Sequence, residues 1–310
     1  MPSKIEILRD RAIMLEQARN FFKVRGVLEV DCPLLTRKAS VDLHIDLIPA
    51  LYAKEEVRYL HSSPEYGMKR LLVAGIGDCY QLAHVFRDGE IGHKHNPEFM
   101  MAEWYRLDAH FEEFILETLD FIQLFLGKLP IEILSYKEVF EKYLKINPLT
   151  ASFQDLKAVI ENREIPTYPS LFDEGKDSLL NLLLATLIEP QLGNGVLSVI
   201  KDYPSSQAAL AKKNGLVASR FEVYYQGIEL ANGYDELADP KEQYLRFEEA
   251  NLERIRLGKP PLPIDTDFIS ALEKGLPSCC GVAVGFDRLM MLRHQTASIA
   301  DVIAFEWALA

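Results

Sequence analysis

Two arginines stand in sequence contexts that suit a polyphosphate. Arg87 ends the alternating segment Asp78–Phe86 and is followed by a short polar loop that returns at Phe99. A strand that ends in arginine holds a planar guanidinium in place, and this group can bind a phosphate or a carboxylate through two hydrogen bonds. Arg288 follows the glycine-punctuated run Gly281–Gly285, where a ligand can approach the backbone closely. Together they predict a nucleoside triphosphate site, with the Phe99 ring offered to the base.

A second group of candidate residues is acidic. Glu222 and Glu229 are seven residues apart, so on one unbroken strand their side chains would point to opposite faces. Gln226-Gly227 lies between them and favours a turn, and a hairpin could bring both carboxylates to one site. Mg²⁺ prefers a few carboxylates together with phosphate oxygens and water. The pair therefore predicts a magnesium site beside the triphosphate.

Composition narrows the class of protein. The formal net charge is −12, and no Lys/Arg-rich arm or basic helix is visible, which disfavours tRNA as a partner and favours cationic ones. His93 and His95 lack the spaced Cys/His companions of a tetrahedral metal site. The polar N-terminus and the short apolar runs, such as Leu179–Ile188, predict a cytoplasmic protein that does not enter a membrane. The cysteines form no C-x-x-C pair, which favours free thiols: Cys32, Cys79, Cys279 and Cys280.

The elements that must position these residues follow from periodicity. Apolar residues at helical spacing, each set followed by a glycine that ends the helix, predict two helices. Alternation of apolar and polar residues predicts strands around the two arginines. Residues 111–201 carry mainly helical periodicity and no chemical signature, so we interpret them as a helical insertion. Strands, then helices, then strands predict an α+β fold with a mixed, mostly antiparallel sheet flanked by helices. The helices are expected at Lys4–Arg25 and Glu65–Ala74, and the strands at Val27–Val30, Val57–Leu60, Asp78–Arg87, Glu98–Arg106 and Ser219–Ile228. A glycine-punctuated turn from strand to helix is expected at Gly281–Arg288, with Arg288 on the helix.

Three short runs together resemble a known family. Residues 86–99 resemble motif 2 of the class II aminoacyl-tRNA synthetases, residues 281–288 resemble motif 3, and residues 22–33 resemble motif 1. Each run is unspecific by itself, since a solvated arginine or a packing turn could produce it, but their order matches the family's. Runs such as Ser63-Pro64-Glu65-Tyr66 and Glu103-Trp104-Tyr105 resemble the lysyl branch, and within it the elongation factor P–(R)-β-lysine ligases. The resemblance extends over nearly all 310 residues.

The resemblance implies a fold, an activity and partners. It implies one catalytic domain over residues 1–310, and no anticodon-binding domain, because the first helix is expected from residue 4. The implied activity is ATP-dependent activation of (R)-β-lysine or lysine as an adenylate, followed by transfer to a lysine side chain of elongation factor P. ATP and Mg²⁺ are the implied cofactors, and a homodimer formed through motif 1 is the implied assembly.

It also implies roles for individual residues. Two acidic groups of residues would hold the two amines of a dibasic substrate, because charge-assisted hydrogen bonds reward correct placement. Ser63 and Glu65 would take the amine near the carboxylate, while Tyr105 and Glu236 would hold the distal one. The implied catalytic residues are Arg87 and Arg288; substrate-binding residues Ser63, Pro64, Glu65, Tyr105 and Glu236; ATP-binding residues Arg87, Asp88, Gly89, Asn96, Phe99, Glu229, Leu230, Gly285 and Arg288; and metal ligands Glu222 and Glu229.

Two departures and two alternatives stay open. Motif 2 of the family reads F-R-x-E, whereas this chain has Gly89 at that place and Glu90 one step later. Ala283 stands where lysyl-tRNA synthetases have glycine, and its methyl group is expected to favour one lysine isomer. The alternatives are a stand-alone lysyl-tRNA synthetase-like enzyme and a catalytically silent paralogue that acts as a regulatory subunit.

Overall fold

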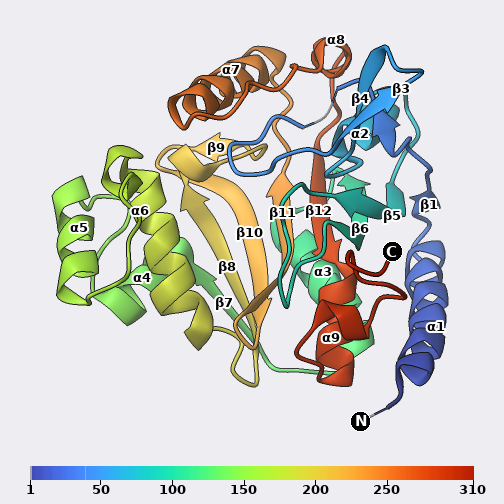
Figure 1. The fold of residues 1–310 in the computed structure, drawn as a ribbon, viewed down its shortest axis with the longest axis horizontal. Helices are drawn as coiled ribbons and strands as arrows, with labels where there is room; N and C mark the ends of the chain where they lie inside the picture. The colour runs from blue at the N-terminus through green and yellow to red at the C-terminus, as the bar shows by residue number, and fades with distance from the viewer. Residues whose placement is uncertain (1, 39) are drawn as a thin grey trace. The chain divides into compact units, whose positions relative to one another are not determined.

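The computed structural model describes residues 2–38 and 40–310, and the chain divides into two units (Figure 1). The first unit combines Met1–Gly127 with Glu236–Ala310, and the second is Lys128–Asp235. Each unit contains both β-strands and helices. The expectation of one catalytic domain over residues 1–310 stays a prediction.

The first unit contains the strands that were expected around the two arginines. They run in the order β1-β5-β6-β12, with β1 parallel to β5 and the other pairs antiparallel. Burial alternates only in the middle of β5, from Gln81 to Val85, where Leu82 and His84 are less buried than their neighbours, and both ends of the strand are buried. The strands are β1 Leu28–Glu29, β5 Cys79–Phe86, β6 Glu98–Leu107 and β12 Cys279–Gly285.

Aromatic residues hold two helices against this sheet. Phe22 of α1 (Lys4–Lys23) stacks on Tyr80 at a centroid distance of 4.1 Å and meets Trp104 at 5.2 Å. Phe121 of α3 (Phe111–Leu126) completes the cluster, 5.2 Å from Trp104. α1 begins with a capping box in which Ser3 and Glu6 satisfy each other's backbone amides.

The remaining elements of the first unit surround α2. Tyr66 of α2 stacks on Phe268 of α8 at 4.4 Å, and Phe247 of α7 lies 5.6 Å from Tyr66. A small sheet in the order β2-β4-β3 is antiparallel throughout. The elements are β2 Leu35–Thr36, β3 Pro49–Tyr52, β4 Glu56–Leu60, α2 Glu65–Val73, α7 Pro240–Arg256, α8 Thr266–Glu273 and α9 Phe286–His294.

In the second unit, helices pack on strands in the order β11-β10-β8-β7, with β9 paired to β10. Tyr136, Phe140 and Tyr203 belong to its buried apolar core. A long hairpin, β10 to β11, forms one side of this unit's strands. The elements are β7 Ile131–Ser135, α4 Tyr136–Leu144, α5 Phe153–Asn162, α6 Lys176–Leu183, β8 Leu197–Pro204, β9 Lys213–Asn214, β10 Val217–Tyr225 and β11 Ile228–Asp235.

The expected helical insertion at residues 111–201 needs correction. Strand β7 lies inside this range and β8 begins in it, and the two pair in parallel. β8 begins with four consecutive buried residues, Leu197 to Ile200. A strand that is buried on both faces shows no alternation, so its sequence cannot be distinguished from a buried helix by period. Strand β11 was also not expected as a separate element.

Candidate functional site

Arg87 lies immediately after β5, as the sequence predicted. Its backbone N–H donates to the Pro97 carbonyl at 2.9 Å, which closes the hairpin between β5 and β6. The guanidinium lies over the Phe99 ring, 5.0 Å from its centroid, and Nη1 is 3.6 Å from Oε1 of Glu90. Nε of Arg87 is buried and has no hydrogen-bond partner. A buried donor without a partner is costly, so this atom fits an anionic ligand.

Glu90 stands beside Arg87 although the sequence displaces it by one position from the family's pattern. Gly89 has φ +74°, and a Cβ added there would meet no atom within 4 Å. Glycine adopts this left-handed backbone without strain, which allows the loop to turn Glu90 back towards the arginine.

His95 connects the motif 2 loop, which follows Arg87, to Arg288 of motif 3. Its Nε2 lies 3.0 Å from Nη2 of Arg288. Desolvation, with the nearby Arg288 guanidinium, lowers the pKa of His95, so the ring is neutral at physiological pH. A neutral imidazole can accept from the guanidinium and hold it at the motif 2 loop. His95 of the motif 2 loop therefore contacts Arg288 of motif 3.

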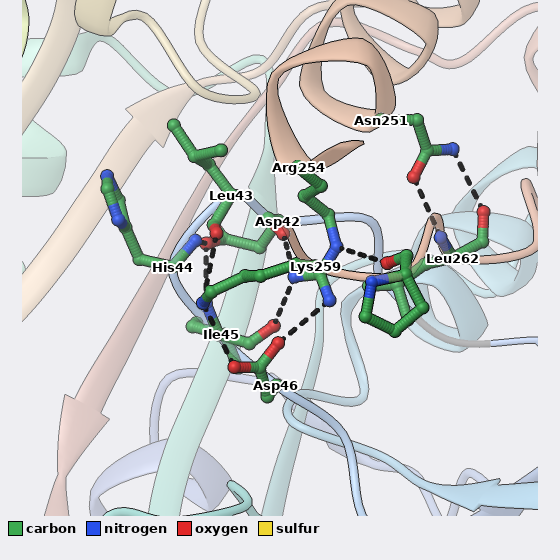
Figure 2. Close-up of polar contacts among 10 residues, drawn as sticks. Asp42, Leu43, His44, Ile45, Asp46, Asn251, Arg254, Lys259 and Leu262 are labelled. Atoms are coloured by element: carbon green, nitrogen blue, oxygen red, sulfur yellow. Dashed lines mark hydrogen bonds and ion pairs between the residues drawn. The ribbon is translucent and has the colours of Figure 1, made fainter. Parts of the chain in front are cut away.

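A clip of polar residues holds the loop next to motif 2 (Figure 2). Arg254 of α7 is 1% exposed and donates to the carbonyls of Asp42 and Ile45 and to the carboxylate of Asp46. Lys259 donates to the same carboxylate at 2.9 Å. The Asp46 carbonyl in turn accepts from the Asp88 backbone N–H at 2.9 Å. The clip therefore fixes the residue that follows Arg87.

A buried cluster of charges lies at the predicted substrate pocket. Lys69 of α2 is fully buried, and its Nζ lies 2.6 Å from Oε1 of Glu65 and 2.6 Å from Oε2 of Glu236. Glu65 and Glu236 are the two carboxylates that the resemblance assigns to the two substrate amines. The structure brings them together around one internal cation.

Glu103 adds a third carboxylate to this cluster. It is 3% exposed, and its Oε2 accepts from the Ser63 hydroxyl at 2.8 Å, while the same hydroxyl accepts from the Glu65 backbone N–H at 3.0 Å. Oε1 of Glu103 is buried without a hydrogen-bond partner. Ser63 therefore orients Glu103 and the start of α2, and the orphaned oxygen fits a cationic donor.

Burial and like charges control the protonation of the cluster. Burial, with Glu65 and Glu236 nearby, raises the pKa of Glu103 to about 8, against the opposing effects of the Ser63 hydrogen bond and of Arg87. Tyr105 is 3% exposed, and burial beside the same two carboxylates raises its pKa well above the usual range. At neutral pH, Glu103 in this state carries a proton and Tyr105 keeps its own.

Strand β12, which carries motif 3, lies next to this cluster. In the antiparallel pairing of β12 with β6, Gly281 stands opposite Tyr105 and Ala283 stands opposite Glu103. Directly opposed residues share a face of the sheet, so the Ala283 methyl group and the Glu103 side chain lie on the same face. A Cβ at Gly281 would collide with Glu236 and Tyr105. Glycine at 281 therefore makes room for two predicted substrate-binding side chains.

In the second unit, the expected hairpin between the two acidic candidates is confirmed. Gln226 and Gly227 have φ of 51° and 67°, as a tight turn between twisted strands requires. Glu222 pairs with Asn232 and Glu229 with Tyr224, with a register shift between Val223 and Tyr224. This register shift changes which residues of β10 stand directly opposite those of β11.

Glu222 is held by several donors. Its Oε1 accepts from Arg220 at 2.5 Å, and its Oε2 accepts from the hydroxyls of Tyr203, at 2.5 Å, and Tyr224. A carboxylate oxygen has two lone pairs, so Oε2 is saturated and Oε1 retains one for a cation. Glu222 thus fits a Mg²⁺ that takes most of its ligands from phosphate and water, but not one caged by protein alone. In the described part of the chain, no group of three or more His, Cys, Asp or Glu side chains could hold a metal.

The remaining predicted residues have plain structural surroundings. The Asn96 amide donates to the Glu98 carbonyl at 2.6 Å, and its oxygen accepts from the Trp307 backbone N–H at 2.9 Å. Gly285 precedes α9, and a Cβ there would make ordinary contacts with Arg288. Leu230 is 2% exposed within β11. The nucleotide contacts predicted for these residues stay predictions, and so does the amino acid contact predicted for Pro64.

Sequence reasoning missed Lys69 and gave Glu103 no role. For both residues, the position in the sequence pattern could have indicated a role. Lys69 lies on the apolar side of α2, three residues from Tyr66 and from Leu72, where a charge is unexpected. Glu103 sits between two buried residues on β6 and shares a face with Tyr105.

The free-thiol prediction is consistent with the structure, which shows all four cysteines buried and unbridged. Burial raises the pKa of Cys32 to about 11 and that of Cys79 to about 12. These thiols are therefore poor nucleophiles. Across residues 2–38 and 40–310, no helix has both the length and the apolar character needed to cross a bilayer.

Comparison with known proteins gives the fold and the motifs a family. The family of class II tRNA synthetases (D, K and N) matches residues 2–307. The chain is 43% identical to the elongation factor P–(R)-β-lysine ligase of Vibrio vulnificus (strain YJ016), over 99% of this chain and 98% of that protein. It is 42% identical to the ligase of that name from Salmonella gallinarum (strain 287/91 / NCTC 13346), over 98% of this chain and 95% of that protein. The chain belongs to the class II tRNA synthetase family and has its catalytic fold.

Proposed function

We propose that this protein activates (R)-β-lysine, or lysine, with ATP and transfers it to a lysine side chain of elongation factor P. The observation that carries the proposal is the buried cluster of Glu65, Glu103 and Glu236, which fits a substrate with two ammonium groups. The names of the similar proteins supply the amino acid and the acceptor. The family supplies the use of ATP.

The proposed chemistry has two steps. A carboxylate oxygen of the amino acid attacks the α-phosphorus of ATP, and the bond to the leaving pyrophosphate breaks. An acceptor amine then attacks the carbonyl carbon of the adenylate, AMP leaves, and the amine loses a proton. Arg87 would neutralise charge at the α-phosphate and the carboxylate, and Arg288 would do so at the γ-phosphate. Positioning and electrostatics suffice for the first step, so no protein base is required.

The predicted nucleotide and metal ligands belong to this proposal. Asp88, Asn96 and Phe99 from motif 2 and Glu229 and Leu230 from β11 would contact ATP. A Mg²⁺ bound with ATP would take ligands from Glu222 and Glu229, and it would supply neutralisation of phosphate charge. The open lone pair on Oε1 of Glu222 supports this assignment.

The cellular setting is proposed on the same basis. We expect a cytoplasmic homodimer whose acceptor is a protein rather than tRNA, and the net charge of −12 favours a basic acceptor surface. A stand-alone lysyl-tRNA synthetase-like enzyme is the competing enzyme, and a silent paralogue is the competing non-enzyme. No specific structural feature favours either one.

Intact-mass analysis of elongation factor P tests the proposal. The factor is incubated with ATP, the protein and either (R)-β-lysine or α-lysine, and a mass gain of one lysyl group is expected. The matched control omits ATP. Absence of the mass gain, together with charging of tRNA, would establish the competing enzyme. Absence of lysine-dependent pyrophosphate exchange would establish the silent paralogue.

A further inference from the structure

Lys69 is a charged residue that the proposed chemistry does not use. It lies one turn after Glu65 on α2, and its side chain has no exposed surface. Its Nζ lies 2.6 Å from an oxygen of Glu65 and 2.6 Å from an oxygen of Glu236, which itself is 1% exposed. The lysine therefore joins a helix residue to a residue far away in the sequence.

An ammonium group is buried at this depth only when it is paired. Burial lowers the pKa of Lys69, but Glu236 and Glu65 raise it by more, so the net pKa is raised and the group stays charged. The lysine and the two carboxylates are thus mutually dependent. Without the cation, two carboxylates would remain buried next to Glu103, and like charges in such a site favour protonation of at least one.

We propose that Lys69 is a positioning residue of the amino acid pocket, which keeps Glu65 and Glu236 ionised and fixes their spacing for the two ammonium groups of a dibasic substrate. The inference rests on the proposed function. A carboxylate that accepts a proton loses its charge and much of its attraction for an ammonium group. Lys69 would act through the two glutamates and would not touch the reacting atoms.

A structural ion pair would behave differently from a positioning residue. Loss of a purely structural pair weakens the fold, and it affects ATP and the amino acid alike. Loss of Lys69 as a positioning residue should impair the amino acid selectively and in a pH-dependent way. The groups whose charge bears on the pH dependence are Glu65, Glu103, Glu236, Tyr105, Arg87, Cys32 and Cys279.

The test compares KM for the lysine-type substrate with KM for ATP in lysine-dependent pyrophosphate exchange. The variants are Lys69→Met, which removes the charge, Lys69→Gln, which keeps a polar donor, and Lys69→Arg, which keeps the charge. Lys157→Met is the matched control, because Lys157 also pairs with a glutamate four residues away but is 35% exposed. Each KM is divided by the wild-type value at the same pH, from 6.5 to 8.5, so that titration of the substrate cancels.

Lys69→Met and Lys69→Gln should raise the amino acid KM at least about thirtyfold at pH 7, as loss of one partner of a buried charge pair typically does. The ratio should shrink as the pH rises, because the carboxylates then regain their charge. The ATP KM should change by less than about threefold. Lys69→Arg should lose less than Lys69→Gln, and Lys157→Met should match the wild type.

Three results would overturn the inference: an unchanged amino acid KM in Lys69→Gln, equal rises in both KM values, or a ratio that does not vary with pH. Lys69→Gln decides the matter if Lys69→Met does not fold. A wild-type protein without lysine-dependent exchange would instead contradict the proposed function, which separates the two failures.

Discussion

At the scale of single residues, the two motif arginines carry the catalytic prediction. Replacing Arg87 or Arg288 by Ala should reduce adenylate formation at least about a hundredfold, because each removes a preorganised charge from a closed site. Pyrophosphate exchange measures the effect. Arg58→Ala is the control, since Arg58 is 23% exposed and Arg87 25%. Exchange rates near the wild type in either variant would show that the site lies elsewhere.

Glu103 gives a prediction about stability and pH. In the folded protein, burial and neighbouring carboxylates raise the pKa of its carboxyl to about 8, whereas in the unfolded chain the pKa is near its ordinary value. Between these values the folded state holds a proton that the unfolded state lacks, so this group lowers the free energy of unfolding as pH rises. Glu103→Gln should therefore gain stability relative to the wild type from pH 5.5 to 8.

Urea unfolding at intervals of pH measures this difference. Exposed Glu113→Gln is the control and should follow the wild type at every pH. Parallel curves for Glu103→Gln and the wild type would contradict the assignment of a raised pKa. The same variant should raise the KM for the amino acid and leave that for ATP nearly unchanged, since Glu103 faces the predicted amine site.

Ala283 gives a prediction about isomer choice. In β-lysine the amine near the carboxylate sits one carbon further along than in α-lysine, so the two isomers crowd the floor of the pocket differently. The methyl group on the Glu103 face is expected to disfavour the α-isomer. One methyl group in a packed pocket changes selectivity by roughly 10–200-fold.

Ala283→Gly should shift competition towards α-lysine and leave ATP binding intact. Ala102→Gly is a matched control, because Ala102 is buried on the neighbouring strand but stands opposite Val284, on the other face. Competition assays with both isomers provide the measurement. An unchanged isomer ratio would place discrimination at Ser63 and Glu65 instead.

At the scale of elements, the clip between α7 and the loop at Asp42–Asp46 holds motif 2 through the hydrogen bond between Asp46 and Asp88. Arg254→Met would leave the carbonyls of Asp42, Ile45 and Pro260 without their donor. We expect a loss of about 2–3 kcal/mol in the free energy of unfolding, as for other buried polar networks. We also expect a higher KM for ATP, because Asp88 then loses a fixed partner.

Arg256→Met on the same helix is the control for the clip. Arg256 is 41% exposed and pairs with Glu253 at the surface, so its loss should cost less than about 1 kcal/mol. Denaturant unfolding and ATP titration measure the two effects. Equal losses in both variants would mean that burial of Arg254 has no consequence for the loop.

At the scale of the whole molecule, the motif 1 segment predicts a dimer. Val24 and Leu28 within it are 69% and 51% exposed, and a second copy would cover them. Light scattering at micromolar concentration should give twice 35.3 kDa. Leu28→Arg should shift the mass towards the monomer, whereas Leu116→Arg, at an equally exposed position of α3, should not. A wild-type monomer would contradict the prediction.

The sequence by itself determined the family, the α+β fold and most of the first unit's elements. Arg87, Gly281 and Arg288 could be recognised because motif order and local spacing survive without any knowledge of long-range contacts. The turn at Gln226-Gly227 was also local, since two residues with positive φ suffice to make it. Comparison with known proteins confirmed the family and the fold.

Only the tertiary structure decided what lies around these residues. Lys69 and Glu236 are separated by 167 positions, so no local pattern could show that one bridges the other to Glu65. The strand β8 escaped prediction because burial on both faces removes the alternation that identifies strands. The raised pKa of Glu103 likewise depends on burial first, and then on carboxylates brought from α2 and from the segment before α7. Local spacing specifies the motifs, whereas charge, burial and close approach arise only when distant segments pack together.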